Sequence, residues 1–393
     1  MILNLPIAWL QLARQRVRFI VALAGIAFIV VLMFMQLGFQ EALYSSATQV
    51  HRNLEGDLFL LSSQYKSLTS NQSFSRTRLY QVLGFNGVES IIPLYLSFAK
   101  IKNPITGQKY SIYVIGFDPD KSGLKITEVN QHLDRLKIPD VVLFDRNSRP
   151  EFGSIAAEFE KGNSEQNLEI FAYIAATGYR VRVGGLFTLG PSFGVDGNLI
   201  VSDSTFLRIF QGVGRQSGMI DVGLVALKPG AKPQKILANL KSHLPKDVQI
   251  FTRQGFRDFE KDYWATRTPI GFTLNLMLTM GSIVGVVIVY QILYSNISNH
   301  LVAYATLKAI GYRNQYLLSV VFQQALILAI LGYIPGFAIS WILYEMARNA
   351  TRLPMVMSFH QASLILVSTI IMCTASGALA VGKLRAAEPA DIF

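Results

Sequence analysis

The 393-residue chain contains one cysteine and five histidines, and this scarcity excludes two classes of protein. Cys373 lies in a long uncharged run, so the polar part of the chain has no residues for a disulfide framework. The histidines never stand at the spacing of a zinc site, and no H-E-x-x-H pattern occurs. We therefore expect no metal site, and the polar part must be stabilised by its own hydrophobic core.

Patterns for nucleotide binding and catalysis are also missing. No G-x-x-x-x-G-K-[ST] loop is present, and the glycine-rich residues 212–218 have a different spacing. Residues 190–194 match G-x-S-x-G, but a nucleophile elbow needs a strand before its serine and a helix after it. Residues 195–198 predict another strand, so we interpret the motif as a β-hairpin connection. The chain is expected to be non-catalytic and to hold no cofactor.

Charge is absent from four long stretches. Residues 268–299 are 32 residues without Asp, Glu, Lys, Arg or His. Similar runs cover 19–40, 314–344 and, interrupted only by His360, 353–382. About 20 apolar residues in a helix cross a bilayer core roughly 30 Å thick. The sequence therefore predicts an α-helical membrane protein with four transmembrane helices in a 1+3 arrangement and a large polar domain after the first.

The net charge of +11 does not indicate nucleic-acid binding. Residues 44–267 hold 27 Lys/Arg and 21 Asp/Glu with the signs interspersed, without a basic stripe that contains aromatics. The connection between the third and fourth spans has only Arg348 and Arg352 as basic residues. The opposite ends of the spans carry Arg14, Arg16, Arg18, Lys308, Arg313, Lys383 and Arg385. The positive-inside rule therefore predicts that both termini are cytoplasmic and that the polar domain lies outside.

Together these patterns divide the chain into nine segments. They are a cytoplasmic amphipathic segment (1–18), transmembrane helix 1 (19–43), an outer α/β domain (44–267), transmembrane helix 2 (268–299), a cytoplasmic helix (300–313), transmembrane helix 3 (314–344), a short outer loop (345–353), transmembrane helix 4 (354–382) and a cytoplasmic tail (383–393). The first segment is either a helix on the membrane surface or an extension of the first span.

The outer domain has the pattern of a mixed α/β fold. Residues 222–227, 232–244 and 248–251 predict a strand, a helix and a strand. Residues 125–215 are predicted to form an inserted subdomain. Phe256, Phe259, Tyr263 and Trp264 predict that the second span continues outward as an amphipathic stalk, with ordinary loops as the alternative.

The uncharged runs of the spans hold no Asp or Glu of the kind that binds coupling ions in ion-driven transporters. Most of their polar groups are better explained as interhelical hydrogen bonds or as end positions than as a relay. These groups are Gln36, Asn275, Gln291, Asn296, Gln323, Gln324 and His360. Energy for transport would thus come from another chain. Residues 301–310 have a helical pattern that Gly311 can close, so this cytoplasmic segment is either a lever for a partner or an interfacial turn.

At this segment the sequence resembles a known family. Residues 306–311, Thr-Leu-Lys-Ala-Ile-Gly, are similar to the "I-L-R-A-L-G" coupling segment of FtsX-like, MacB-type ABC transporter permeases. The 1+3 arrangement, Gly332-x-x-Pro335-Gly336 in the third span and the closing residues 387–391 agree with this family. Residues 34–40 and 185–197 resemble its DevC-like subgroup. Val302-Ala303 and Gln323-Gln324 depart from it, because the family often has Arg-Glu and Glu there.

The resemblance implies a MacB-like architecture and a non-catalytic permease subunit of a tripartite exporter in a bacterial inner membrane. Its partners would be a cytoplasmic ABC ATPase that binds ATP-Mg, a periplasmic membrane-fusion protein, a TolC-like outer-membrane channel and a second copy of the permease. DevC-like members are associated with glycolipid export. Coupling to the ATPase is implied for Thr306, Leu307, Lys308, Ala309, Ile310, Gly311, Tyr312 and Arg313.

Other readings remain open at this stage. Gly281-x-x-x-Gly285 in the second span permits close helix packing, either at a dimer interface or within one subunit. The protein is alternatively an FtsX-like mechanotransmitter that activates an external partner, a lipoprotein-release permease, or a receptor. A receptor is disfavoured because the predicted cytoplasmic segments are too short for a signalling domain. The sequence does not identify the substrate.

Overall fold

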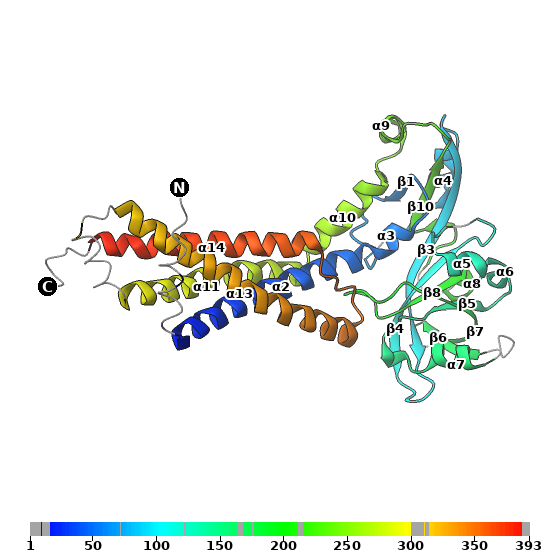
Figure 1. The fold of residues 1–393 in the computed structure, drawn as a ribbon. Coiled ribbons are helices and arrows are strands. Elements are labelled where there is room, and N and C mark those ends of the chain that lie inside the picture. The colour runs from blue at the N-terminus through cyan, green and yellow to red at the C-terminus, as the bar shows by residue number, and fades with distance from the viewer. Residues whose placement is uncertain are drawn as a thin grey trace. The chain divides into compact units, whose positions relative to one another are not determined.

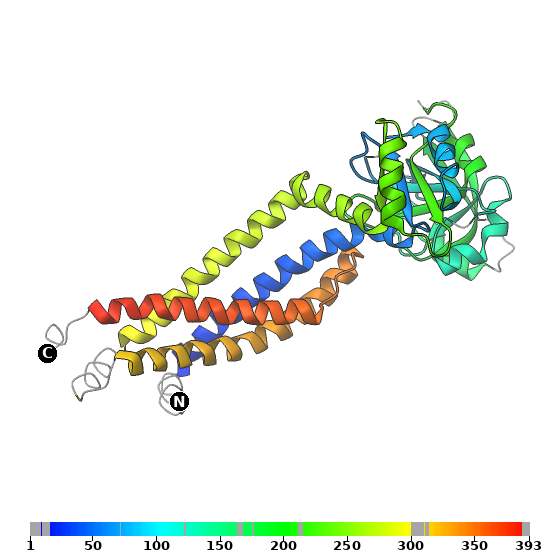
Figure 2. The same cartoon turned by 90° about the horizontal axis from the view of Figure 1, so that it is seen from above.

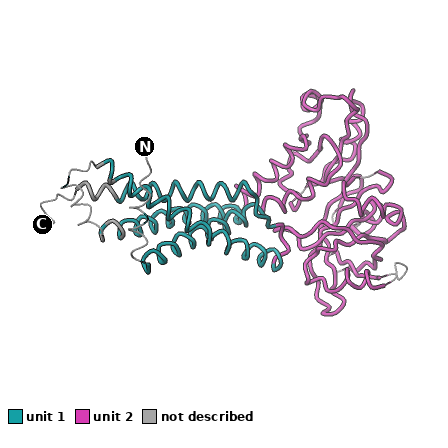
Figure 3. Tube along the Cα trace, in the orientation of Figure 1, with its two compact units in different colours: residues 1–42, 269–350, 355–393 teal, residues 43–268, 351–354 magenta. Residues whose placement is uncertain are grey.

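The computed structural model describes residues 9, 16–70, 72–121, 123–162, 168–174, 177–210, 215–299, 310 and 314–386. The chain divides into two compact units, which are drawn in different colours in Figure 3. The membrane unit comprises residues 1–42, 269–350 and 355–393. The α/β unit comprises residues 43–268 and 351–354.

Among the described residues of the membrane unit, four helices are long and apolar enough to cross a membrane. They run side by side over much of their length in Figures 1 and 2. Their bounds are α2 (Arg16–Ala47), α11 (Pro269–Asn299), α13 (Asn314–Thr351) and α14 (Phe359–Ala386). This confirms the predicted α-helical membrane protein with a 1+3 arrangement and a large α/β domain between the first and second spans.

The helices do not end where the uncharged runs end. The segment 345–353, predicted as a loop, is helical up to Thr351, and α14 begins at Phe359 rather than at residue 354. Helix propensity and side-chain pairing do not stop at the edge of an apolar run, and Glu345 pairs with Arg348 at 2.6 Å on the same helix. The helix stops where Arg352 takes a φ of 58° shortly before Pro354.

Within the described part of the α/β unit, nine strands form one sheet, in the order β11-β1-β10-β3-β4-β8-β5-β7-β6. The strands are β1 (Leu58–Ser62), β3 (Val88–Lys102), β4 (Lys109–Phe117), β5 (Val141–Asp145), β6 (Leu168–Ile174), β7 (Thr177–Phe187), β8 (Asn198–Ser202), β10 (Val222–Leu227) and β11 (Val248–Thr252). A small second sheet pairs β2 (Phe74–Ser75) with β9 (Met219–Ile220).

Among the described helices of this unit, only α9 and α10 are longer than eight residues. The helices are α3 (Gln49–Asn53), α4 (Arg76–Leu83), α5 (Thr127–Gln131), α6 (Leu133–Leu136), α7 (Ile155–Lys161), α8 (Asp203–Phe210), α9 (Pro233–His243) and α10 (Arg253–Thr266), with a 3₁₀ turn at Pro150–Phe152. Two hydrophobic cores form on the two faces of the sheet, because alternating residues of a strand point to opposite faces. Leu60 and Val225 of the strands pack with Leu79 of α4 in one core, and Phe59 and Phe117 of the strands pack with Phe256 of α10 in the other.

One half of the sheet has the strand order of a β-α-β-β-α-β unit. The strands β1, β3, β10 and β11 stand in the order 4-1-3-2 when counted along the chain, with α4 and α9 as the two connecting helices. The predicted strand-helix-strand at the end of the domain is confirmed as β10, α9 and β11, with β1 paired between the two strands. All five residues of β1 are buried because it lies at the centre of this half.

The other half closes on itself. Besides β7, β6 pairs with β3, through Lys100 opposite Tyr173 and Ile101 opposite Ala172. The strands β3, β4, β8, β5, β7 and β6 therefore form a closed ring. The structure differs here from the predicted insert of residues 125–215. The chain between β3 and β10 is indeed an insertion in the four-stranded half, but β3 runs through both halves and joins them in one sheet.

The expected β-hairpin around residues 190–194 is wrong. The element directly after the motif is a strand, β8, and not a helix, as the sequence predicts. However, β5 pairs with both β7 and β8 and lies between them, so the two strands joined by this loop are not neighbours. The strand after Ser192 is incompatible with a nucleophile elbow.

Candidate functional site

The segment for which the resemblance implies coupling to an ATPase, residues 306–313, lies outside the described residues apart from Ile310. The side chain of Ile310 is 70% exposed. The closing residues 387–391 also lie outside them. The role of residues 306–313 therefore stays a prediction, and the site that the structure shows in detail is in the α/β unit.

Two linker segments connect the α/β unit to the spans along the chain. The first runs from the end of α2 through α3, and the second is α10, which ends at Thr266. The predicted continuous stalk is interrupted at residues 267–268, because Pro269 lacks an N–H and disfavours helical backbone at the residue before it. Phe256 and Trp264, expected on that stalk, are buried in the α/β unit.

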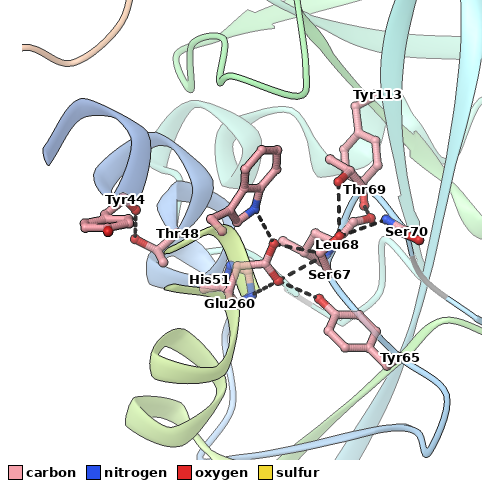
Figure 4. A network of polar contacts seen from close by, with 11 residues as sticks. Tyr44, Thr48, His51, Tyr65, Ser67, Leu68, Thr69, Ser70, Tyr113 and Glu260 are labelled. Carbon is pink, nitrogen blue, oxygen red and sulfur yellow. Dashed lines mark hydrogen bonds and ion pairs between the residues drawn. The ribbon is translucent and has the colours of Figure 1, made fainter. Parts of the chain in front are cut away.

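The carboxylate of Glu260 on α10 is the centre of a buried polar network, which we call the Glu260 cluster: His51, Tyr65, Leu68, Glu260 and Trp264 (Figure 4). The Tyr65 hydroxyl donates to Oε2 at 3.0 Å, and the Trp264 indole donates to Oε1 at 3.1 Å. The Leu68 amide lies 3.2 and 3.1 Å from the two oxygens. Nε2 of His51 on α3 is 3.4 Å from Oε2. The cluster thus joins α10 to α3 and to the loop after β1.

Burial shapes the electrostatics of the cluster. Both Glu260 and His51 are 1% exposed, and among the described residues His51 is the basic group that lies within ion-pair distance of the carboxylate. Burial, followed by the charge of Glu260, raises the pKa of Tyr65 well above its ordinary value, so Tyr65 stays a hydrogen-bond donor. A second tyrosine, Tyr113, extends the network by donating to the Leu68 carbonyl at 2.6 Å.

A second contact joins the same two linker segments. Arg253, the first residue of α10, donates to the carbonyls of Leu54 at 3.0 Å and Gly56 at 2.6 Å, just after the end of α3. These carbonyls follow a helix end, where backbone acceptors lack intrahelical partners. Thr252 caps α10 by accepting from the amide of Gly255 at 3.1 Å. The start and middle of α10 are thereby fixed to the first linker.

The loop before β8 packs beside the Glu260 cluster. A cavity of ≈ 30 Å³, which is space for about one water, is lined by residues of both linkers and of this loop, including Ser46, Gly190, Ser192 and Trp264. A Cβ at Gly194 would lie 3.2 Å from the indole of Trp264, so glycine permits the close approach. Residues 185–197 therefore contact the linkers in this structure.

Asp145 at the end of β5 holds this loop in place. Its carboxylate accepts from the amides of Leu189 at 3.1 Å and Gly190 at 2.8 Å, and from the side chain of Asn198 at 2.7 Å. Burial raises the pKa of Asp145, and the hydrogen bonds from Asn198, Leu189 and Gly190 oppose this by a smaller amount. A fully buried carboxylate thus fixes the loop that faces the Glu260 cluster.

The raised pKa of Asp145 predicts a specific pH dependence. The folded state binds this proton more tightly than the unfolded state, so the contribution of Asp145 to stability is full below its unfolded pKa, near 3.8, and is lost as the pH rises through the folded value. In the wild type, the free energy of unfolding should therefore fall as the pH rises above about 4, and we expect this fall to be smaller in Asp145→Asn. At neutral pH the variant should also lose about 1–3 kcal/mol of stability, because one acceptor oxygen of the carboxylate is gone. Urea unfolding at several pH values measures both effects.

The matched control is Asp262→Asn on the exposed side of α10. This variant should leave the pH dependence that Asp145 causes in place, because Asp262 is exposed and is not among the described hydrogen-bond partners of Asp145. Equal slopes for wild type and Asp145→Asn would show that Asp145 does not titrate with folding.

In the membrane unit, the glycines expected at helix contacts all face other helices of the same chain. A Cβ at Gly281 would lie 2.6 Å from Nε2 of Gln36 on α2, and one at Gly285 would lie 2.9 Å from Sδ of Met372 on α14. Gly332 and Gly336 face Ile26 and Val30 of α2 in the same way, on either side of Pro335 within α13. Here the four glycines allow packing within one subunit.

Polar side chains add contacts between α2 and α11. The Gln36 amide donates to the Met277 carbonyl at 2.9 Å, and Gln40 donates to Asn275 at 2.7 Å. This confirms the interpretation of Gln36 and Asn275 as interhelical hydrogen-bonding groups. On α13, Tyr344 donates to the Phe34 carbonyl at 2.7 Å. Residues 34–40 therefore contact two other spans, α11 and α13.

Comparison with known proteins gives a family for the C-terminal part. Residues 275–389 match the family model described as FtsX-like permease C-terminal. Comparison with curated proteins found no match. Among solved structures, the periplasmic region of MacB from Actinobacillus actinomycetemcomitans is 15% identical, with 52% of this chain and 92% of that chain covered and a TM-score of 0.33. The extracellular domain of the noncanonic ABC-type transporter YknZ from Gram-positive bacteria is 16% identical, with 50% and 99% covered and a TM-score of 0.32.

The family match covers the region of α11, α13 and α14, the three spans that follow the α/β unit. It includes the segment between α11 and α13 and the glycines of α13. Residues 275–389 are therefore similar to the C-terminal domain of FtsX-like permeases.

Proposed function

We propose that the chain is the permease subunit of an ATP-driven ABC exporter that transmits motion rather than conducting substrate through its spans. The family match of residues 275–389 and the four spans support this class. The uncharged runs of the spans contain no acidic residue for an ion-driven mechanism, and the chain has no phosphate-binding loop. ATP-Mg would be bound by a separate cytoplasmic ATPase that contacts the segment 306–313.

The observation that carries the proposal is the Glu260 cluster. It fixes α10, which precedes the second span, to α3, which follows the first span, and ties both to the loop after β1. Arg253 adds a second attachment between the same segments. Displacement of either linker would therefore reach the sheet through a rigid connection, as transmission of motion requires.

The finer assignments extend this proposal. The permease would sit as a dimer in a bacterial inner membrane with both termini in the cytoplasm and the α/β unit in the periplasm. There it would work with a membrane-fusion protein and a TolC-like outer-membrane channel to expel a substrate from the envelope. The stretches 34–40 and 185–197 support a DevC-like exporter, with a glycolipid as the substrate class.

The test is affinity purification of the protein from its native membrane in mild detergent, with the copurifying proteins identified by mass spectrometry. A Lys308→Glu, Gly311→Val variant is purified in parallel. We expect the wild type, but not the variant, to retain a P-loop ATPase, because the variant reverses a charge and stiffens a helix end. A membrane-fusion protein in the same sample supports the exporter.

The control is Lys232→Glu, a charge reversal in the α/β unit. This variant should insert into the membrane and copurify with the ATPase as the wild type does. Recovery of an ATPase with an external hydrolase but without a fusion protein would instead support the mechanotransmitter alternative. Absence of any ATPase from the wild-type sample would contradict the proposal.

A further inference from the structure

One face of the closed half of the sheet is exposed and rich in positive charge. The strand pairings place Lys100 opposite Tyr173, Phe171 opposite Arg180, and Glu169 opposite Arg182. Directly opposed residues of antiparallel strands point to the same side. The basic sheet face defined in this way consists of five cations, one acid and two aromatic residues: Lys100, Lys102, Lys109, Arg180, Arg182, Glu169, Phe171 and Tyr173.

The charges on this face are poorly neutralised. Lys102 and Lys109 stand directly opposite each other on β3 and β4, an arrangement that destabilises a sheet when both residues are charged. Both lysines are exposed. Among the described residues, the ion pairing on this face is Arg180 with Glu169 at 3.4 Å. The fold therefore keeps an unfavourable pair of like charges at a place where the sheet itself does not need them.

The aromatic residues hold the cations in position. Nζ of Lys109 reaches across β3 to lie 3.5 Å from the centre of the Tyr173 ring, and the Arg180 guanidinium lies 5.7 Å from the centre of the Phe171 ring. Rings covered by cations are not free to stack on a sugar. The cations, in contrast, lose little further freedom when an anion binds them.

We propose that the basic sheet face is a docking surface for an acidic face of a partner protein. The face extends over the four adjacent strands β4, β3, β6 and β7, and is therefore about 14 Å wide at a strand spacing of about 4.8 Å. A single phosphate headgroup spans only a fraction of this width. Carboxylates spread over a folded surface match both the spacing and the sign of the charges.

Side chains, rather than backbone, provide the contacts at this surface. In the ring, β6 pairs with β7 along its whole length and with β3 at Ala172 and Tyr173, so its second edge is partly occupied and is a poor site for an added strand. The proposal is independent of the ATPase assignment, since it concerns only the α/β unit.

The experiment measures binding of a fluorescent poly-L-glutamate peptide to the full-length protein in phosphatidylcholine nanodiscs at low salt. The test variant is Lys100→Gln, Lys102→Gln, Lys109→Gln. The control is Lys232→Gln, Lys235→Gln, Lys241→Gln, which removes the same charge from exposed positions on and beside α9. We expect about tenfold weaker binding for the test variant and little change for the control.

Thermal unfolding of the same samples shows whether the variants are folded. The test variant should melt no lower than wild type, because it removes the opposed lysines. Equal weakening by both variants, or unchanged binding by the test variant, would overturn the proposal. Binding through the same lysines to phosphatidylglycerol vesicles but not to poly-L-glutamate would also overturn it, in favour of an anionic membrane surface.

Discussion

Replacement of Glu260 by alanine is expected to lower the free energy of unfolding of the α/β unit by about 3–5 kcal/mol. The substitution removes the acceptor for three buried donors, namely the Tyr65 hydroxyl, the Leu68 amide and the Trp264 indole. Burial also keeps Tyr65 protonated, so its hydroxyl is left as an unsatisfied donor. His51 loses the carboxylate oxygen that lies 3.4 Å from its Nε2 at the same time.

Thermal unfolding of the full-length protein in detergent, followed by tryptophan fluorescence, measures this loss. For a unit of this size, 3 kcal/mol corresponds to a fall of about 6–12 °C in the unfolding midpoint. Glu260→Gln should lie between alanine and wild type, because it retains one acceptor oxygen. Asp258→Ala removes an exposed carboxylate from the same helix and should be nearly silent. A midpoint for Glu260→Ala within 2 °C of the Asp258 control would refute the role of the cluster.

The second large effect is expected in the membrane unit, from Gly332→Ala combined with Gly336→Ala. A Cβ at Gly336 would lie 2.7 Å from Cγ1 of Val30 and 2.9 Å from the Ala27 carbonyl, and one at Gly332 would lie 2.6 Å from Cγ2 of Ile26. Real Cβ atoms do not approach other atoms this closely, so α13 would have to move away from α2. Overpacking of this kind costs about 1–3 kcal/mol per site.

The control uses the same chemical change at a roomier position. A Cβ at Gly377 on α14 would meet its nearest neighbours at 3.6 Å, an ordinary contact distance, so Gly377→Ala should be tolerated. Thermal stability of the purified proteins and their yield in the membrane provide the comparison. If the double variant is as stable as Gly377→Ala, the contact between α2 and α13 is not tightly packed.

The four spans and the segment from β10 to α9 could be predicted from the sequence, because each depends on the composition of one continuous stretch of residues. Absence of charge over 20 or more residues predicts the four spans, because burying a charge in lipid is costly. The apolar strand Val222–Leu227 and the amphipathic helix after it are also legible locally. The insertion between β3 and β10 was less clear, since the pairing of β3 with β6 and with β10 joins residues far apart in sequence.

One part of the Glu260 cluster could have been predicted from a pattern in the sequence. Phe256, Glu260 and Trp264 recur every four residues, so the acid lies on the same face of α10 as the buried aromatics. An acid on an apolar stripe predicts a buried partner. His51 and Tyr65 were not identifiable as that partner, because their proximity depends on how α3 and the loop after β1 fold against α10.

The placement of β1 at the centre of its half of the sheet has a consequence for synthesis of the chain. Both strands that pair with β1 come from much later in the sequence, since β10 begins at Val222 and β11 at Val248. At 5–20 residues per second, about 10–30 s separate the emergence of β1 from that of β10. For that time Leu-Phe-Leu-Leu-Ser has two unpaired edges and no cover, beside a membrane helix that is already being inserted. The topology itself therefore leaves this apolar strand open to pairing with other chains until β10 and β11 have been made.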